Sequence, residues 1–527
     1  MLAFWGFTWP LAPAAAIMWD VVRPKSIQEK LDEAEQAQAD KVAAQERKLW
    51  KGAEKALKKG VDNAALGAIV SMGTEPADFE RKGQKLYLRT GASSANLHGL
   101  VLGGSGAGKT ETLKRLAAIF ASQTDYDIFF IDPKPTADLK FYFAGLMAEY
   151  GRTCKMYPDS PFNGFRGDAR SVHNRLLTIP VLGTEGASAY YAELTEEYVW
   201  LGMNAGDGLP RTFDEVAQRL DYDYLLQYYA NDPTSLQSIQ RIKRQDANSV
   251  VMRFNNVARK FSTISGAGWA FEDVRAAYFG LPVLEASRDV DAIARFLIED
   301  LKHYFATRKQ RNRRTVVFFD EFSAFGSENV VNLMELVRSH GGIVILASQT
   351  TAALGDDRLQ KRILGNVTIY LQRMNDPREV AALGGMQPVL DVSRHMDTKP
   401  NPNGIARYVD KSVIDPTKVA QLPLGGAYII NRGRVAHIKV QQAPVLDWNK
   451  IGTTHLDLAL QWMSANNPNA PVLVRRASPA VPHAAAAARP LAPARTEPTP
   501  ALAHGAPTKA ATPSNAPNQA DGADDFI

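Results

Sequence analysis

The first regular pattern along the chain is a narrow apolar stripe on a charged stretch. Between residues 26 and 60, apolar side chains such as Ile27, Leu31, Leu49 and Leu57 recur mostly three, four or seven positions apart, and Glu, Lys, Gln and Arg fill the other positions. This spacing predicts one long helix. The stripe is too narrow and alanine-rich for a core helix, so we expect either a stalk with a weak helix–helix seam or a solvated helix.

From residue 87 onward, short apolar runs alternate with helical stretches. The runs are Asn96–Gly103, Asp127–Asp132, Thr315–Asp320, Ile343–Ser348 and Val367–Gln372. Nearly all of their residues are apolar, which is typical of strands buried on both faces of a parallel sheet. The fold class predicted from this order is α/β, with a mainly parallel sheet and right-handed crossovers.

The long interval between the second and third runs has a different pattern. Residues 185–265 show helical periodicity and little strand character, which predicts an all-helical insertion in the sheet domain. We expect a strand in "AAYFGLPVLEA" (276–286) and a helix over 289–314. A terminal hairpin is expected over 426–440, turning at Arg432-Gly433.

The two ends of the chain differ from its middle. The first 22 residues begin "MLAFWGFTWPLAPAAAIMW", which is long enough for one membrane span, although Pro10 and Pro13 would interrupt a helix. We expect a membrane anchor here. The alternative is an apolar, loosely structured segment that packs on the protein itself. Residues 466–527 are rich in Ala, Pro and Thr and end in the acidic tip "DGADDFI", which predicts a disordered tail.

These patterns divide the chain into six predicted segments. They are an apolar anchor (1–22), a charged stalk (23–80), the first part of the core (81–184), the helical insertion (185–265), the second part of the core (266–465) and the tail (466–527). A length of 527 residues agrees with more than one globular unit. The net charge of +5 permits a nucleic-acid partner without arguing for one, and the single cysteine, Cys154, excludes a disulfide framework.

A phosphate-binding loop follows the first apolar run. The segment fits the pattern GxxxxGK[ST], in which small residues let backbone N–H groups turn toward phosphate oxygens at the start of a helix. Its last two side chains are expected to reach the β- and γ-phosphates of ATP and to hold Mg²⁺, respectively. The residues are Gly103, Gly104, Ser105, Gly106, Ala107, Gly108, Lys109 and Thr110.

Two carboxylates and a glutamine end later strands. Asp320 and Glu321 follow "TVVFF", and we expect the first to join the Mg²⁺ shell and the second to activate water as a general base. Gln349 ends "IVILAS" and is expected to sense the γ-phosphate or to align the attacking water. Solvated strand ends are the alternative for each residue taken alone.

An arginine could complete the site from a neighbouring subunit. Arg338 lies on a predicted helix eleven residues before Gln349, and in a ring it could neutralise transition-state charge on the neighbour's γ-phosphate. Arg362 and Arg373 compete for that role. The basic runs 241–244 and 308–314 could contact a phosphate backbone, although solvated helix ends are the commoner explanation.

Taken in order, these motifs resemble those of the FtsK–HerA superfamily of ring-forming DNA pumps. The stretches "NLHGLVLGGSGAGKTETLKRL", "FFIDPKPTADL", "VVFFDEFSAF", "ELVRSHGGIVILASQT" and "NVTIYLQRMNDPREVAALGG" carry the resemblance, which is closest to the type IV secretion coupling proteins of conjugation (the TraD/TraG-like group). It implies a RecA-like P-loop ATPase core with an inserted all-helical domain. It gives no firm role to Asp132, Pro133 and Lys134.

The resemblance also implies an activity and partners. It suggests a homo-hexameric ATPase that uses ATP and Mg²⁺ to deliver relaxosome-bound single-stranded DNA to a type IV secretion channel. Relaxase or relaxosome proteins and channel components would be its partners, at the cytoplasmic face of a bacterial inner membrane or in the cytoplasm. The alternatives are another DNA motor of this superfamily, a protein-translocating secretion ATPase, and a nucleotide-gated adaptor with slow turnover.

Overall fold

The computed structural model describes residues 27–58, 62–72, 83–88, 90, 97–180, 187–281, 283–308, 313–325, 327–394 and 404–466. The predicted anchor (1–22) and nearly all of the predicted tail (466–527) lie outside these ranges. Among the described helices, none combines the length and the hydrophobicity that a membrane-spanning segment needs.

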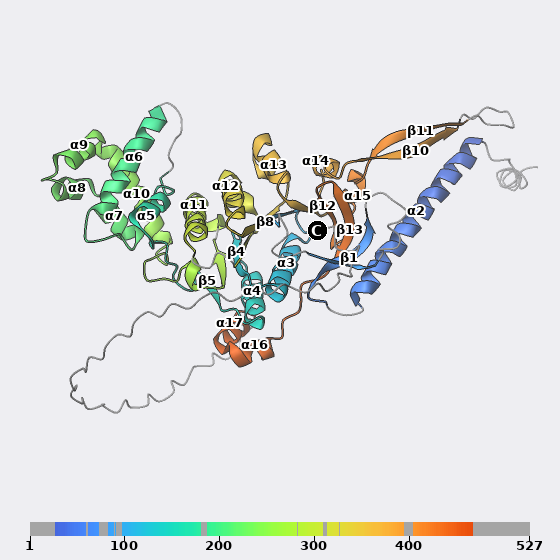
Figure 1. Cartoon of the computed structure of the whole chain (residues 1–527), viewed down its shortest axis with the longest axis horizontal. Coiled ribbons are helices and arrows are strands. Elements are labelled where there is room, and N and C mark those ends of the chain that lie inside the picture. Colours follow the sequence, from blue (N-terminus) through green and yellow to red (C-terminus); the bar gives the residue numbers. More distant parts are fainter. Residues whose placement is uncertain are drawn as a thin grey trace, which may run out of the picture.

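One large sheet organises the described part of the chain (Figure 1). Its strands lie in the order β2-β1-β13-β12-β9-β3-β8-β7-β4-β6-β5. From β9 to β5 every neighbouring pair is parallel, whereas β12, β13, β1 and β2 extend the sheet with antiparallel pairs. The strands are β1 (Ala65–Met72), β2 (Lys85–Tyr87), β3 (Gly99–Leu102), β4 (Asp127–Asp132), β5 (Cys154–Tyr157), β6 (Ala276–Gly280), β7 (Thr315–Phe319), β8 (Gly342–Ser348), β9 (Thr368–Leu371), β12 (Gly426–Asn431) and β13 (Arg434–Val440).

Helices cover both faces of the parallel part because successive strand residues point to opposite sides. In β4, Phe129 and Ile131 join one apolar core, and Ile128 and Phe130 join the other. The first core is closed by α11 (Val283–Thr307) and α12 (Ser327–Arg338), and the second by α3 (Lys109–Gln123) and α4 (Ala137–Glu149). The continuous apolar runs in the sequence follow from this double burial.

A group of helices follows β5 and precedes β6 in the sequence. It lies at one edge of the sheet (Figure 1). The stretch predicted as an all-helical insertion contains α6 to α10, and α5 precedes it. At its base, Arg175 and Arg166 donate to Asp300 of α11 at 2.7 and 2.8 Å, and the Arg175 and Asp300 side chains are fully buried. The helices are α5 (Ala169–Leu176), α6 (Ala187–Asn204), α7 (Phe213–Arg219), α8 (Tyr222–Tyr228), α9 (Pro233–Arg241) and α10 (Arg244–Lys260).

Three predicted boundaries around β6 and α11 are wrong. The strand expected over 276–286 ends at Gly280, and α11 already begins at Val283 and ends at Thr307, short of the predicted 314. The sequence between them, Leu281-Pro282, contains the reason. A proline has no N–H to donate to a neighbouring strand, so a central strand is not expected to continue through position 282.

The other end of the sheet carries a long helix and an arm. Helix α2 (Ile27–Lys58) is the charged helix predicted from the apolar stripe, and it packs on β1 and β13. The hairpin β12–β13 turns at Arg432-Gly433 as predicted, both with positive φ. A second hairpin, β10 (Met386–Arg394) with β11 (Gly404–Ser412), forms a separate two-stranded arm (Figure 1).

Short helices connect the remaining elements. Near the C-terminal end of the described residues, α16 and α17 pack beside α4, where Trp448 and Trp462 stack with ring centroids 4.5 Å apart. These elements are η2 (Phe271–Asp273), η3 (Phe322–Phe325), η4 (Ala352–Leu354), α13 (Asp357–Leu364), α14 (Arg378–Ala382), α15 (Pro416–Ala420), α16 (Trp448–Thr454) and α17 (Leu456–Asn466).

Candidate active site

The glycine-rich loop joins β3 to α3 and leaves room for an anion. Gly106 and Gly108 have φ values of 70° and 97°, a region that favours glycine, and a Cβ on Gly106 would meet no atom within 4 Å. A Cβ on Gly103, in contrast, would lie 2.9 Å from the Cβ of Gln372. The loop leads directly into the first turn of α3, so its backbone N–H groups lie at the positive end of the helix dipole. This arrangement suits phosphate oxygens.

Lys109 folds back over this loop. Its ammonium group donates to the carbonyl oxygens of Gly103 at 2.9 Å and Gly104 at 3.3 Å, and 9% of the residue is exposed. Burial lowers the pKa of Lys109, and the nearby charges of Glu321 and Asp320 partly oppose this shift. The ammonium is therefore held beside the loop by carbonyl groups that a phosphate could replace as its partners.

The hydroxyl of Thr110 and the carboxylate of Asp320 meet although 210 positions separate them in the sequence. Thr110 Oγ1 donates to Asp320 Oδ2 at 3.1 Å. Asp320 directly follows β7, and its backbone N–H donates to the Ile131 carbonyl of β4. Burial, together with the charge of Asp132, raises the pKa of Asp320 to about 6. A hydroxyl and a carboxylate beside a phosphate loop match the oxygen ligands that Mg²⁺ prefers.

Glu321 and Gln349 form a second pair at the same edge of the sheet. The Gln349 amide donates to the Glu321 carboxylate at 3.0 Å. Strand β8 lies between β3 and β7, so Gln349 at its carboxyl end faces both motifs. Glu321 has a φ of 49°, a conformation that costs a non-glycine residue free energy and is frequent at functional sites. The structure thus places Glu321 and Gln349 next to the Thr110–Asp320 pair.

Two residues support the loop in ways that the sequence prediction missed; it gave no role to Gln372 and considered Arg373 only as an arginine finger. Gln372, fully buried at the end of β9, donates from its side-chain amide to Thr112 Oγ1 at 2.6 Å. The carbonyl of Arg373 accepts a hydrogen bond from the N–H of Gly104 at 2.8 Å. For Gln372 the available signal was a polar residue ending an apolar strand, the same signal that identified Gln349; the backbone contact of Arg373 has no signal in the sequence.

The three candidate arginines lie in different places. Arg338 is exposed at the end of α12, four residues before β8 begins, so it lies at the amino edge of the strands, opposite the phosphate loop. At that edge, burial lowers the pKa of His98 to about 4, and the positive charge of Arg338 contributes to the shift. Arg362 pairs with Glu335 at 2.6 Å, and the exposed Arg373 adjoins the loop. Within one subunit, therefore, Arg338 is not brought to the site.

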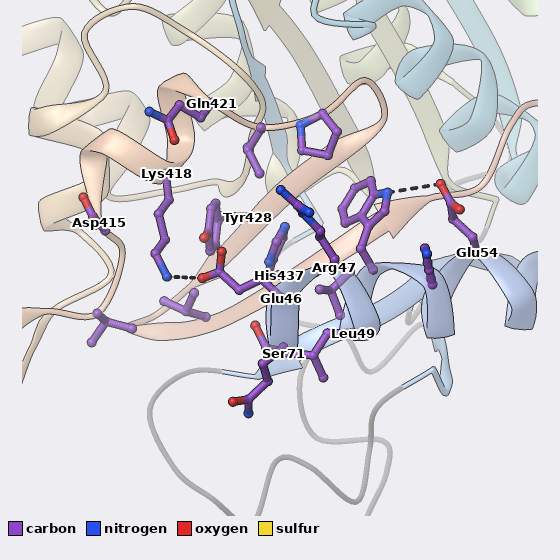
Figure 2. A pocket seen from close by; sticks show the side chains of 18 of the residues that line it. Glu46, Arg47, Leu49, Glu54, Ser71, Asp415, Lys418, Gln421, Tyr428 and His437 are labelled. Carbon is purple, nitrogen blue, oxygen red and sulfur yellow. Dashed lines mark hydrogen bonds and ion pairs between the residues drawn. The ribbon is translucent and has the colours of Figure 1, made fainter. Parts of the chain in front are cut away.

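A cavity of about 810 Å³ lies elsewhere, between α2, β13 and α15 (Figure 2). His437 stacks on Tyr428 there with ring centroids 4.5 Å apart, and Lys418 forms an ion pair with Glu46 across the opening. Burial lowers the pKa of His437 to about 4. The described lining residues include none of the predicted site residues, so this cavity marks the junction of α2 with the sheet rather than the nucleotide site.

Comparison with known proteins gives a fold. No family model matches the chain, and no curated protein matches its sequence. Among solved structures, it is similar to the bacterial conjugative coupling protein TrwBΔN70 in its unbound form, with a TM-score of 0.51 and 13% identity over 66% of this chain and 85% of that one.

Two further solved structures are similar at lower scores. The plasmid coupling protein TrwB in complex with ADP and Mg²⁺ has a TM-score of 0.49 and 14% identity, over 66% of this chain and 86% of that one. VirB4 of Thermoanaerobacter pseudethanolicus has a TM-score of 0.45 and 14% identity, over 73% of this chain and 98% of that one. Over the part that they share, the chain described here has the fold of the TrwBΔN70 structure.

Proposed function

We propose that this protein is an ATP-hydrolysing, ring-forming DNA translocase that acts as a conjugative coupling protein. It would deliver relaxosome-bound single-stranded DNA to a type IV secretion channel from the cytoplasmic face of a bacterial inner membrane. The observation that carries the proposal is the junction of two pairs, Thr110 with Asp320 and Glu321 with Gln349, beside a phosphate loop in a coupling-protein-like fold.

The residues of the site fit ATP and Mg²⁺. The loop offers backbone N–H groups and the buried ammonium of Lys109 to the β- and γ-phosphates. Thr110 and Asp320 supply hard oxygen ligands, which would hold Mg²⁺ together with phosphate oxygens and water. When bound, Mg²⁺ neutralises charge that develops on the phosphates during transfer.

Hydrolysis then requires a base and a means of aligning it. Glu321 would accept a proton from the attacking water on its carboxylate, and the Gln349 amide, which donates to that carboxylate, would help to align it. Arg338 would come from a neighbouring subunit of a homo-hexamer, because it lies at the opposite edge of its own sheet. Closing that subunit interface would move pore loops along a DNA backbone that they contact electrostatically.

The proposed cargo is tested by the ATPase rate of the full chain with and without single-stranded DNA. The wild type is expected to hydrolyse ATP faster when DNA is added, and the matched Glu321→Gln variant is expected to lose turnover under both conditions. A measurable rate that DNA leaves unchanged would contradict the DNA-pump proposal. Nucleotide binding with negligible turnover in both conditions would favour the nucleotide-gated adaptor.

A further inference from the structure

The loop after β4 contains a lysine whose backbone conformation is restricted by its neighbours in the sequence. Lys134 stands between Pro133 and Pro135 in "DPKPT", and Thr136 then caps α4. A proline fixes its own φ and also restricts the residue before it to extended conformations. Lys134 itself is exposed at the carboxyl edge of the sheet. Its backbone is therefore held in place while its side chain faces solvent.

A buried carboxylate anchors this loop. Asp132 is 2% exposed, accepts from Tyr278 Oη at 2.6 Å and accepts from the Lys134 N–H at 2.8 Å. Its carbonyl accepts from the N–H of Leu281 at 2.8 Å. Asp132 is thus fixed from β6 on one side and fixes the backbone of Lys134 on the other.

The anchored loop adjoins the nucleotide site. Strand β4 is the parallel neighbour of β7, and the N–H of Asp320 donates to the carbonyl of Ile131, the residue before Asp132. Burial is the main cause of the lowered pKa of Lys109, and the nearby positive charge of Lys134 lowers it further. Two like charges so placed repel each other. The carboxylates of Asp320 and Glu321 act on Lys109 and that of Asp132 acts on Lys134, and a phosphate beside both ammonium groups would reduce their repulsion further. The described residues give Lys134 no ion pair, whereas Lys140 on α4 pairs with Asp159 at 2.7 Å.

We propose that Lys134 is a second phosphate-binding cation, which contacts the terminal phosphate of the bound nucleoside triphosphate, and that Asp132 is the positioning residue that holds it there. This inference rests on the nucleotide site of the proposed function and not on its cargo. Lys109 would grip the phosphates from the loop side, and Lys134 would reach the terminal phosphate from the β4 side. Charge on that phosphate would then be compensated from two directions.

The test is titration calorimetry of the full chain, with Mg²⁺, against ADP and a non-hydrolysable ATP analogue. Losing a hydrogen bond to a charged group weakens binding about tenfold or more, so Lys134→Ala is expected to lose that much affinity for the analogue and less than about twofold for ADP. Lys134→Arg should retain most of the affinity for the analogue. Lys140→Ala removes a lysine of the same region that already has a partner, and should bind both nucleotides like the wild type.

The possible results distinguish a failure of the role proposed for Lys134 from a failure of the proposed function. An equal loss for both nucleotides, or no loss for either, overturns the role of Lys134 while the nucleotide site stands. A wild type that binds neither nucleotide overturns both proposals, and a rate that DNA does not stimulate affects the cargo alone. For Asp132→Asn we expect a smaller loss that is again selective for the analogue; a lower Tm with equal loss for both nucleotides would reduce Asp132 to a structural role.

Discussion

The amide of Gln349 donates a hydrogen bond to the carboxylate of Glu321 at 3.0 Å, joining the ends of β7 and β8. If Gln349 acts by aligning this carboxylate, Gln349→Ala should lower kcat by about 10-fold to 100-fold with little change in KM. Glu321→Gln should lower kcat further. Steady-state ATPase assays of the full chain would measure both effects.

The double variant sharpens this prediction. Residues that act as a unit show non-additive effects. Adding Gln349→Ala to Glu321→Gln should therefore cost little more than Glu321→Gln alone. Effects that multiply would mean that Gln349 acts independently of Glu321, for example on the γ-phosphate.

The ionised carboxylate of Asp320 is expected to lower the free energy of unfolding of the nucleotide-free protein. Its pKa is raised from the ordinary 3.8 to about 6, so between these values the folded chain keeps a proton that the unfolded chain releases. The free energy of unfolding therefore falls as pH rises through this window. Asp320→Asn should raise the Tm of the nucleotide-free protein at about pH 7.5 and change it less at about pH 4. It should also abolish Mg²⁺-dependent hydrolysis; a Tm that drops at both pH values would contradict the prediction.

Glu321 offers a matched pair of variants for backbone strain. Its φ of 49° costs a non-glycine residue on the order of 1 kcal/mol, which glycine avoids. Both Glu321→Gly and Glu321→Gln should lose turnover. Denaturant unfolding is expected to show Glu321→Gly as the more stable of the two, because glutamine keeps the strained backbone. Equal stabilities would mean that the surrounding contacts compensate the strain.

Subunit mixing tests the assignment of Arg338. Arg338 lies across the sheet from its own phosphate loop, so if it is the arginine finger it acts at the site of a neighbouring subunit. Lys109→Ala and Arg338→Ala should each be inactive alone, and mixed rings should regain part of the ATPase rate, since some interfaces combine an intact loop with an intact arginine. Arg373→Ala is the comparison: its residue adjoins the loop of its own subunit. Full activity of Arg338→Ala would exclude it as the finger.

The strands of the parallel sheet and the functional side chains that follow them could be predicted from local sequence patterns. Apolar runs such as Asp127–Asp132 identify buried strands because both faces of the sheet are covered, and the phosphate-loop pattern is local. The long helix α2 and the turn at Arg432-Gly433 are also local signals. The predicted residues Lys109, Thr110 and Asp320 needed nothing beyond residue type and spacing to be named.

Which of these residues lie in contact depends on the packing of the sheet and could not be predicted from local patterns. Strand order places β8 between β3 and β7, and this order is set by packing of distant segments rather than by any local pattern. It therefore decides that Thr110 meets Asp320, that Gln349 meets Glu321, and that Arg338 falls at the opposite edge. The same packing buries Gln372 beneath the loop and Asp132 beside Tyr278. A polar residue after an apolar strand looks alike in every case, and only its neighbours across the sheet give it a role.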